Sequence, residues 1–77
     1  MSKLDSKIGP KIKAFRRQMG MQANKLAEEL DISPSYLNLI EKGKRKIDGD
    51  LLINVCEKLR IELSDLTSKT DLNLEHN

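Results

Sequence analysis

The apolar residues of this chain fall into short stripes with helical spacing, and polar or glycine-containing corners separate the stripes. In the N-terminal part, apolar positions recur at i, i+4, i+7 and i+11, which is typical of the buried face of an amphipathic helix. These positions are Ile8, Ile12, Phe15 and Met19. The spacing predicts a first helix over residues 8–19, with Pro10 in its first turn, where a missing N–H costs little. Gly20 is expected to end this helix in a left-handed conformation.

A second and a third short helix are predicted next along the chain, over residues 22–30 and 34–42. Leu26, Ala27 and Leu30 form the apolar stripe of the second helix. Leu37 and Ile40 form the stripe of the third. The small side chain of Ala27 suits a point at which one helix crosses the other closely.

Residues 31–33 form the corner between these two helices. Asp31 stands where the turn requires a positive φ, a conformation that Asp tolerates better than most residues do. Ile32 is expected to insert into the core. Ser33 followed by Pro34 indicates a helix start, because a hydroxyl N-cap precedes a proline at the first helical position. Gly43 is expected to end the third helix.

The C-terminal part predicts one further full helix and one short one. Asp48 can cap a fourth helix over residues 49–59. The inward-facing residues of this helix are expected to be Leu51, Leu52, Val55 and Leu59. Ser64 or Asp65 starts a short fifth helix that buries Leu66.

These elements predict an all-α fold, a compact bundle of about five short helices over residues 8–66. Residues 1–7 are polar and are expected to form a flexible N-terminal arm. Residues 67–77 are polar and weakly patterned, so they form a tail, a linker or the start of a further segment. A chain of 77 residues has room for one small domain.

Composition excludes several classes of protein. One cysteine, Cys56, allows no internal disulfide, and one histidine, His76, allows no zinc framework. No apolar run is long enough to span a bilayer or to serve as a signal peptide, so we expect a cytoplasmic protein without metal or cofactor. Residues 8–66 contain no Ser/His or Cys/His pair and no phosphate-binding glycine loop, which argues against an enzyme. Cys56 lies beside the inward stripe and is expected to be a packed, inert thiol rather than a redox sensor.

Charge is unevenly distributed along the chain although the net charge is only +2. Residues 1–46 hold eleven Lys and Arg against five Asp and Glu, which gives +6. Residues 47–77 hold three against seven, which gives −4. The basic half contains the two helices with the tight corner, which is the polarity that a phosphate-facing surface needs. A solvated surface with chance asymmetry is the alternative.

Two short helices that meet at such a corner form a helix-turn-helix, a motif that usually places its second helix in the major groove of DNA. The outward residues of this helix are therefore candidate base contacts: Ser33, Pro34, Ser35, Asn38 and Leu39. The Asn38 amide can pair bidentately with adenine, and Pro34 and Leu39 can touch a thymine methyl group. Ser35 can hydrogen-bond several bases, so it carries less information. Ordinary solvated positions are the alternative for each residue.

Candidate phosphate contacts flank the same helix. Lys42, Lys44, Arg45 and Lys46 place four cations within residues 42–46, directly after it. A loop at this place adds salt-sensitive affinity that does not depend on sequence. Gln22 at the start of the second helix can hold another phosphate, and the Tyr36 hydroxyl can donate to one.

At these residues the chain resembles the Cro/C1-type helix-turn-helix family, also called the Xre family, over about residues 8–66. The features shared with the family are Ile8-Gly9, Ile12, Arg16, Gly20, Leu26-Ala27, Ile32-Ser33, Ile40-Glu41, Gly43 and Arg45. The resemblance implies a five-helix domain of the lambda-repressor type. It also implies phosphate contacts from the start of the second helix and the loop after the third, and base contacts from the third. A salt bridge between Arg16 and Glu41, which the apolar pattern leaves open, is implied as well.

Two departures from the family pattern are visible. The family usually has Thr-Gln at the start of the second helix, where this chain has Gln22-Ala23. Ala23 therefore stands where the family has its phosphate-binding Gln, and Gln22 is the residue that can make this contact instead. The usual glycine of the corner is Asp31. The stretch SPSYLNLIE is similar to regulators of short-chain fatty-acid metabolism, in which the motif precedes a longer C-terminal region.

The sequence therefore predicts a regulator, most simply a repressor, that binds a pseudo-palindromic site in double-stranded DNA as a homodimer. The alternative is a protein-interaction module with the same fold, such as an antitoxin or an adaptor. An adaptor has no need of four cations beside a polar helix face, so the loop at residues 42–46 and Asn38 distinguish the two interpretations.

Overall fold

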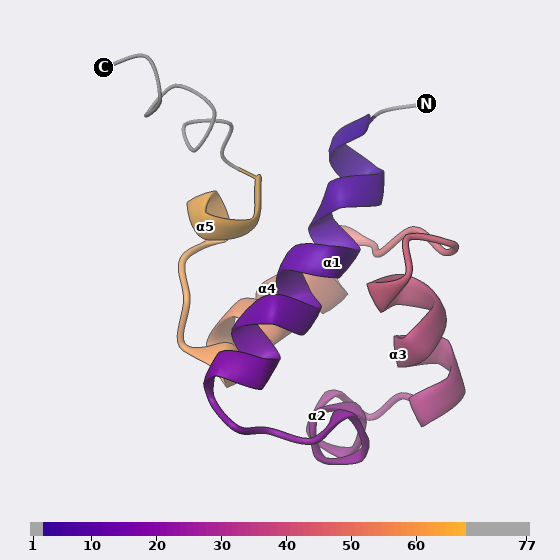
Figure 1. Ribbon diagram of the computed structural model, residues 1–77, viewed down its shortest axis with the longest axis vertical. Helices are drawn as coiled ribbons and strands as arrows, with labels where there is room; N and C mark the ends of the chain where they lie inside the picture. The colour runs from indigo at the N-terminus through magenta and orange to yellow at the C-terminus, as the bar shows by residue number, and fades with distance from the viewer. Residues whose placement is uncertain (1–2, 68–77) are drawn as a thin grey trace.

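The computed structural model describes the backbone of residues 3–67 and the side chains of residues 8–67. Over this range the chain forms five α-helices and no strand (Figure 1). They are α1 (Lys3–Gln18), α2 (Ala23–Leu30), α3 (Pro34–Glu41), α4 (Gly49–Leu59) and α5 (Leu63–Thr67). The helix α1 packs against α3, α4 and α5, while α2 packs against α3 and α4. The all-α class predicted from the apolar stripes is confirmed.

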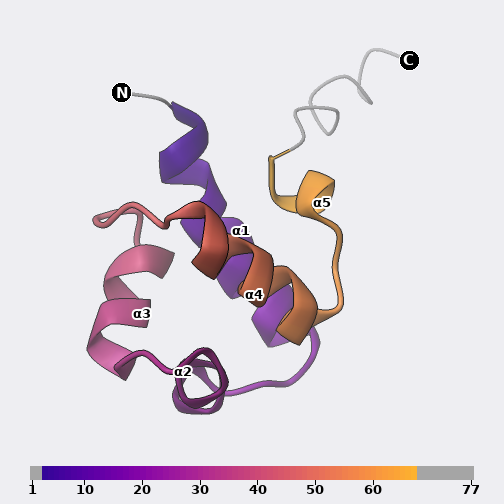
Figure 2. The same cartoon turned by 180° about the vertical axis from the view of Figure 1, so that it is seen from behind.

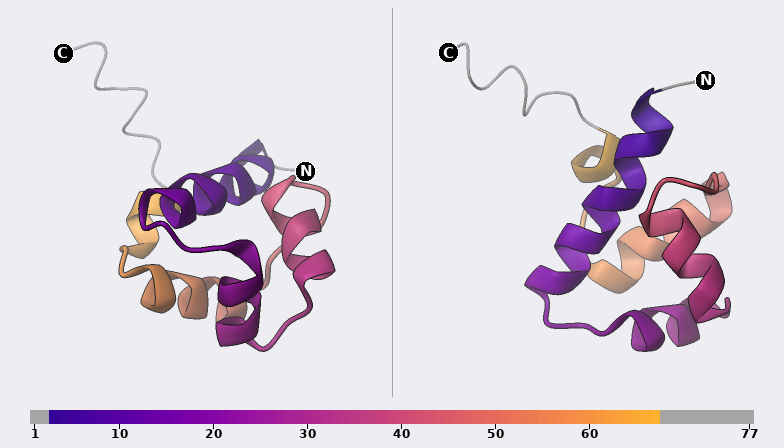
Figure 3. Two further views of the ribbon diagram at one scale, coloured as in Figure 1. Left: turned by 60° about the horizontal axis from the view of Figure 1, so that its bottom comes forward. Right: turned by 45° about the vertical axis from the view of Figure 1, so that its right-hand side comes forward.

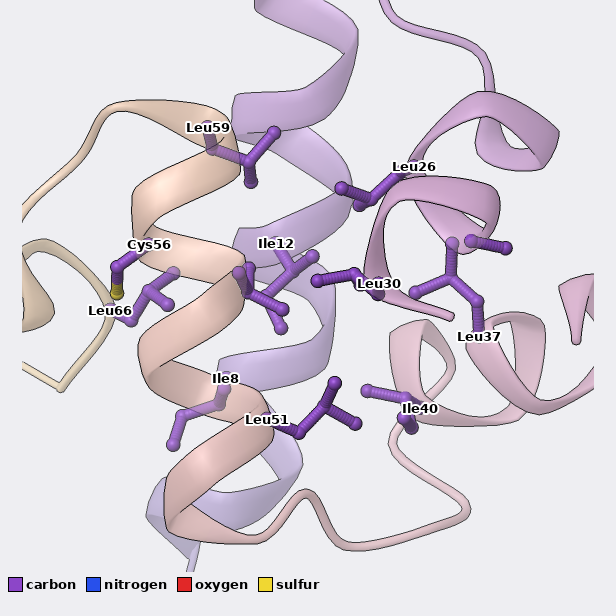
Figure 4. Packing of buried hydrophobic residues seen from close by; sticks show 12 residues of the cluster. Ile8, Ile12, Leu26, Leu30, Leu37, Ile40, Leu51, Cys56, Leu59 and Leu66 are labelled. Carbon is purple, nitrogen blue, oxygen red and sulfur yellow. The ribbon is translucent and has the colours of Figure 1, made fainter. Parts of the chain in front are cut away.

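One apolar core lies between these helices (Figure 4). Every helix contributes to it, and the fully buried side chains include Ile12, Leu26, Leu37, Val55 and Leu66. Ala27 is also fully buried, and α2 packs against α3. The side chains of Leu52 and Ile61 pack against the margin of the core and are only partly buried.

Two helix starts have the side-chain caps that the sequence predicts. The Ser33 Oγ accepts the backbone N–H of Tyr36 at 3.0 Å. The Asp48 Oδ1 accepts the backbone N–H of Leu51 at 2.8 Å. Each bond satisfies a donor that the first turn of a helix leaves unpaired, so the starts of α3 and α4 are fixed by local chemistry.

Four helices end with a residue in the left-handed conformation. These residues are Gly20, Asp31, Gly43 and Arg60, with φ of 73°, 62°, 78° and 58°. At each end, two backbone hydrogen bonds return to the last turn, for example from Ile32 to Ala27 and from Asp31 to Glu28. This is the Schellman arrangement, which reverses the chain sharply. Glycine adopts the conformation without strain, but Asp31 and Arg60 do so at some cost.

Replacing Arg60 with glycine is expected to raise the free energy of unfolding by about 0.5–1 kcal/mol. The substitution removes the left-handed strain of an L-residue, about 1–2 kcal/mol, and part of this gain is lost to the greater entropy of the unfolded chain. The midpoint of urea unfolding measures the change. Arg60→Ala is the matched control, because it removes the same side chain and keeps the Cβ atom. Equal effects of the two substitutions would contradict this explanation.

Three sequence predictions differ from the structure. Helix α1 begins at Lys3 rather than residue 8, so residues 3–7 are helical and are not an arm. No glycine or proline precedes Gly9, so no helix-breaking residue prevents the helix from starting before residue 8. As a result Pro10 lies inside α1 rather than in its first turn, at the cost of one backbone hydrogen bond. Met19 is 45% exposed rather than buried, because it follows the last residue of α1 and helical periodicity no longer sets its direction.

The predicted C-terminal boundary is only partly covered by the structure. Helix α5 ends at Thr67, the first residue of the expected tail. Residues 68–77, and with them His76, lie outside the described residues.

Candidate nucleic-acid interface

Helix α3 presents one buried face and one exposed face. Leu37 and Ile40 are 0% and 2% exposed and hold the helix against the core. Figures 1 and 2 show α3 at the edge of the molecule, on the side of α1 and α4 that lies away from α5. The left view of Figure 3 shows the short corner that joins α2 to α3. Both the core contacts and the corner therefore fix the direction in which the outer face points.

All five candidate base contacts lie on the exposed side of α3 or at its start. Four of them line one open hollow on the protein surface, namely Pro34, Ser35, Asn38 and Leu39. Ser33 does not line it, and its hydroxyl already accepts a hydrogen bond as the N-cap of α3. The structure thus brings together four of the five residues, and it gives Ser33 a structural role that uses part of its hydrogen-bonding capacity.

The loop at residues 42–46, called the basic loop below, follows α3 directly. Its four cations, Lys42, Lys44, Arg45 and Lys46, are exposed. The guanidinium carbon of Arg45 lies over the Tyr36 ring, 5.5 Å from its centroid. Such a cation–π contact contributes about 0.5–1 kcal/mol at an exposed site. It holds the loop against the first turn of α3, so at least one cation has a defined place next to this helix.

Arg16 joins three parts of the motif. Its Nε and Nη2 atoms donate to the two carboxylate oxygens of Glu41, at 2.8 and 3.1 Å. Its Nη1 donates to the backbone carbonyl of Met21 at 2.8 Å. Arg16 and Glu41 are only 8% and 6% exposed. The salt bridge implied by the family resemblance is therefore present, in the bidentate geometry that makes such pairs strong.

The position of this ion pair matters for the candidate phosphate contacts. Met21 immediately precedes Gln22, and Glu41 immediately precedes Lys42. One guanidinium thus sets the distance between the start of α2 and the end of α3. Gln22 is exposed at the N-cap of α2, and its side chain makes no capping bond there. Its amide therefore remains available at a helix N-terminus, where backbone N–H groups favour anions.

Two of these contacts were not predicted from the sequence. The stacking of Arg45 on Tyr36 links an aromatic residue to a cation in the next loop, whereas the sequence pattern indicated only a phosphate contact through the Tyr36 hydroxyl. The bond from Arg16 to the Met21 carbonyl was also missed. The signal for it was the tight turn at Gly20, which brings the backbone after α1 back towards the end of that helix.

Cys56 is packed in the core, as predicted. It is 7% exposed, and Figure 4 shows its sulfur beside Leu66. Burial, together with the nearby charges of Asp65 and Glu62, raises the pKa of the Cys56 thiol. The thiol therefore stays protonated at neutral pH, which makes it a poor nucleophile.

Membrane-spanning helices and metal sites are both absent from the part of the chain that the structure describes. No helix within residues 3–67 is long and apolar enough to cross a membrane. The same residues contain no group of three or more His, Cys, Asp or Glu side chains placed to hold a metal ion.

A family model described as "Helix-turn-helix" matches residues 12–66, which is most of the domain and includes both helices of the motif. The chain belongs to the Cro/C1-type helix-turn-helix family. A curated relative is the HTH-type transcriptional regulator RamB of Mycobacterium tuberculosis, matched in strains CDC 1551 / Oshkosh and ATCC 25618 / H37Rv. It is 31% identical over 67 residues, and the match covers 87% of this chain. The chain spans only 14% of the length of RamB.

The fold of this family member is also found in solved structures. Two crystal structures of the clp gene regulator ClgR from Corynebacterium glutamicum match it with a TM-score of 0.83 and 27% sequence identity. The matches cover 97% and 96% of this chain, and 82% and 96% of the two ClgR chains. Both RamB and ClgR are named as regulators, and neither name describes an enzyme. Family and relatives together support DNA-binding transcription regulation as the class of function.

Proposed function

We propose that the chain binds a specific sequence in double-stranded DNA and regulates transcription there, most simply as a repressor. Helix α3 enters the major groove with Pro34, Ser35, Asn38 and Leu39 towards the bases. The basic loop and Gln22 contact the phosphate backbone on either side. Occupying a site near a promoter excludes other proteins from it, so repression requires no further activity.

The observation that carries this proposal is the exposed outer face of α3, with Pro34, Ser35, Asn38 and Leu39, followed directly by the four exposed cations of the basic loop. Base readout requires polar and apolar groups that are free to meet base edges, whereas phosphate contacts fix the register of the helix on the duplex. The outer face of α3 supplies the first kind of group, and the basic loop supplies the second. Membership of the helix-turn-helix family supports the same division of roles.

We further propose that two copies bind a pseudo-palindromic operator. The recognition helices of such a dimer lie about one helical turn of DNA apart, roughly 34 Å between half-site centres. Inserting five base pairs between the half-sites rotates one of them to the opposite side of the duplex. Affinity should then fall to that of a single half-site, whereas a monomeric binder would tolerate the insertion.

The experiment that tests the proposed function is an unbiased selection of duplex DNA by the chain, followed by titration of the enriched duplex against salt. An enriched palindrome with steep salt dependence supports the proposal. If the four loop cations contact phosphates, the slope of log K against log salt is expected to include about −3 to −4 per chain. Absence of binding to any duplex would favour the protein-interaction module.

Asn38→Ala is expected to cost about 1–3 kcal/mol in binding to the selected site and to relax specificity at one base pair. The Asn38 side chain is exposed, so the free energy of unfolding should change by less than about 0.5 kcal/mol. Asn54→Ala is the matched control, because Asn54 is an exposed asparagine on α4. Affinities for all four base pairs at each position of the site measure the effect. If the variant discriminates among the four base pairs as well as the unsubstituted chain at every position, Asn38 does not face the bases and the proposed orientation of α3 is wrong.

Arg45→Ala is expected to weaken binding to all sequences by a similar factor and to reduce the salt slope by about one. The guanidinium is held over the Tyr36 ring in the first turn of α3, and an exposed cation there can contact a phosphate without selecting a base. Lys58→Ala on α4 removes an exposed cation away from this loop and should leave the slope unchanged. The measurement is the affinity for the specific duplex and for random duplexes, titrated from low to physiological salt. Loss of affinity for the specific duplex alone would show that Arg45 reads a base.

A further inference from the structure

Helix α3 is poor in charged side chains. From Pro34 to Glu41 it contains no lysine and no arginine, and Glu41 is its one charged residue. That carboxylate is buried and accepts both of its hydrogen bonds from Arg16. No charged side chain of α3 therefore reaches the groove.

This composition removes two of the standard ways to read a base. Guanine is most often read by Arg or Lys, which donate to O6 and N7, and cytosine can be read by a carboxylate that accepts from N4. Neither chemistry is available on α3. What remains on its outer face is one amide, one serine hydroxyl and two apolar side chains.

These remaining groups are arranged in two rows along the helix. Pro34 and Asn38 are four residues apart, as are Ser35 and Leu39, so each pair lies on one line of the helix surface. Together they line the open hollow. Each row has one polar and one apolar residue, and Asn38 and Leu39 belong to the two neighbouring rows. Leu39 is 37% exposed although it is apolar.

An A·T base pair has the complementary edge. In the major groove adenine presents N7 as an acceptor and the N6 amino group as a donor, which an Asn amide matches with two hydrogen bonds. Thymine presents a 5-methyl group, which is the apolar surface that an exposed leucine can cover. No other base pair offers an amide-matching edge and a methyl group together.

We propose that α3 specifies A·T base pairs, with Asn38 on adenine and Leu39 on the methyl group of a thymine in the same or the neighbouring base pair. This inference rests on the proposed DNA-binding function and names what the recognition helix selects. Leu39 is thereby a specificity-determining residue and not an ordinary surface residue. No bidentate Arg or Lys contact to guanine is available on α3, so strong selection of guanine or cytosine in the operator comes from residues outside α3 or from DNA shape.

The test uses chemically modified versions of the duplex that selection with the chain enriches. Each thymine is replaced in turn by uracil, which keeps the base pairing and removes only the methyl group. At the contacted thymine, affinity of the unsubstituted chain should fall about fourfold, the value of one buried methyl group. Each adenine is likewise replaced by 7-deazaadenine, which removes the N7 acceptor of the bidentate pair.

Variants then assign the two effects to side chains. With Leu39→Ala, uracil and thymine should bind equally at the contacted position, while the 7-deazaadenine penalty persists. With Asn38→Ala, 7-deazaadenine and adenine should bind equally at the contacted position, while the uracil penalty persists. Ile53→Ala is the matched control for Leu39→Ala, because Ile53 is 51% exposed on α4, and it should retain both penalties.

The outcomes separate this inference from the proposed function. Sequence-specific binding in which the Leu39→Ala or Asn38→Ala variant loses preference at a G·C pair would overturn the A·T assignment and leave the proposed function intact. A uracil penalty that persists undiminished in Leu39→Ala would also overturn it. Failure of the unsubstituted chain to bind any duplex would remove the proposed function, and the A·T assignment with it.

Discussion

Glu41→Ala is expected to lower the free energy of unfolding by about 3–5 kcal/mol, because it leaves the guanidinium of Arg16 buried without its counter-ion. Glu41 accepts two of the hydrogen bonds that Arg16 donates, and the Met21 carbonyl accepts the third. A domain of this size has about 5–15 kcal/mol of stability in total. The variant should therefore be close to unfolding at 37 °C. Urea unfolding followed by far-ultraviolet circular dichroism measures the loss.

Two controls separate the buried charge from other effects of the substitution. Lys25 and Glu29 form an exposed pair on α2 at 3.5 Å, and Glu29→Ala should cost less than about 1 kcal/mol, as exposed pairs usually do. The double variant Arg16→Met/Glu41→Leu replaces both charges with apolar groups and should recover most of the stability. A loss below about 1 kcal/mol in Glu41→Ala would show that water reaches Arg16 and that the pair is not effectively buried.

The parts of the fold that local rules specify were predicted well. The bounds of α4, residues 49–59, follow from a carboxylate N-cap and an apolar stripe that agree with each other. The corner at Asp31 was likewise predicted with its left-handed backbone, because φ in a tight turn is decided by neighbouring residues. The start of α1 was wrong because a proline favours the first turn of a helix but does not require it.

The candidate site likewise has features that the sequence predicts and features that it does not. Periodicity along one helix predicts which side chains of α3 face outward, since burying Leu37 and Ile40 exposes Asn38 and Leu39. It cannot predict which side chains from distant segments meet. The stacking of Arg45 on Tyr36 depends on how the basic loop folds back onto α3, which apolar periodicity does not decide. The bond from Arg16 to the Met21 carbonyl follows from the tight turn at Gly20, a local signal that periodicity along one helix does not use. The ion pair of Arg16 with Glu41 was anticipated only through the family resemblance.

The close approach of α1 to α3 at Gly9 was not predicted from the apolar pattern either, although Ile8-Gly9 was among the family features. Gly9 is buried against the last turn of α3. A Cβ atom at this position would overlap the carbonyl oxygen of Ile40. It would also lie 3.0 Å from the carbonyl carbon of Ile40 and 3.1 Å from that of Glu41. These are backbone atoms, which cannot rotate away as the end of a side chain can.

Gly9→Ala is therefore expected to destabilise the domain by about 3 kcal/mol or more, at or above the upper end of the usual cost of overpacking. Gly49→Ala is the matched control. Gly49 is also helical, but a Cβ atom there meets nothing within 4 Å, so this variant should be neutral or slightly stabilising. Thermal unfolding of the two variants measures the difference, and about 1 kcal/mol corresponds to a shift of roughly 4–8 °C in a domain of this size.

The same substitution also tests whether the position of α3 matters for DNA binding. Gly9 and Arg16 are seven residues apart on α1, so two helical turns place them on the same side of that helix. Both act on the C-terminal end of α3, Gly9 by admitting its backbone and Arg16 by binding Glu41. Under conditions where Gly9→Ala remains folded, the shifted α3 should discriminate less between specific and random duplexes, while salt-dependent binding through the basic loop persists. If instead a folded Gly9→Ala variant keeps full discrimination, α3 tolerates displacement and its packing against α1 contributes to stability alone.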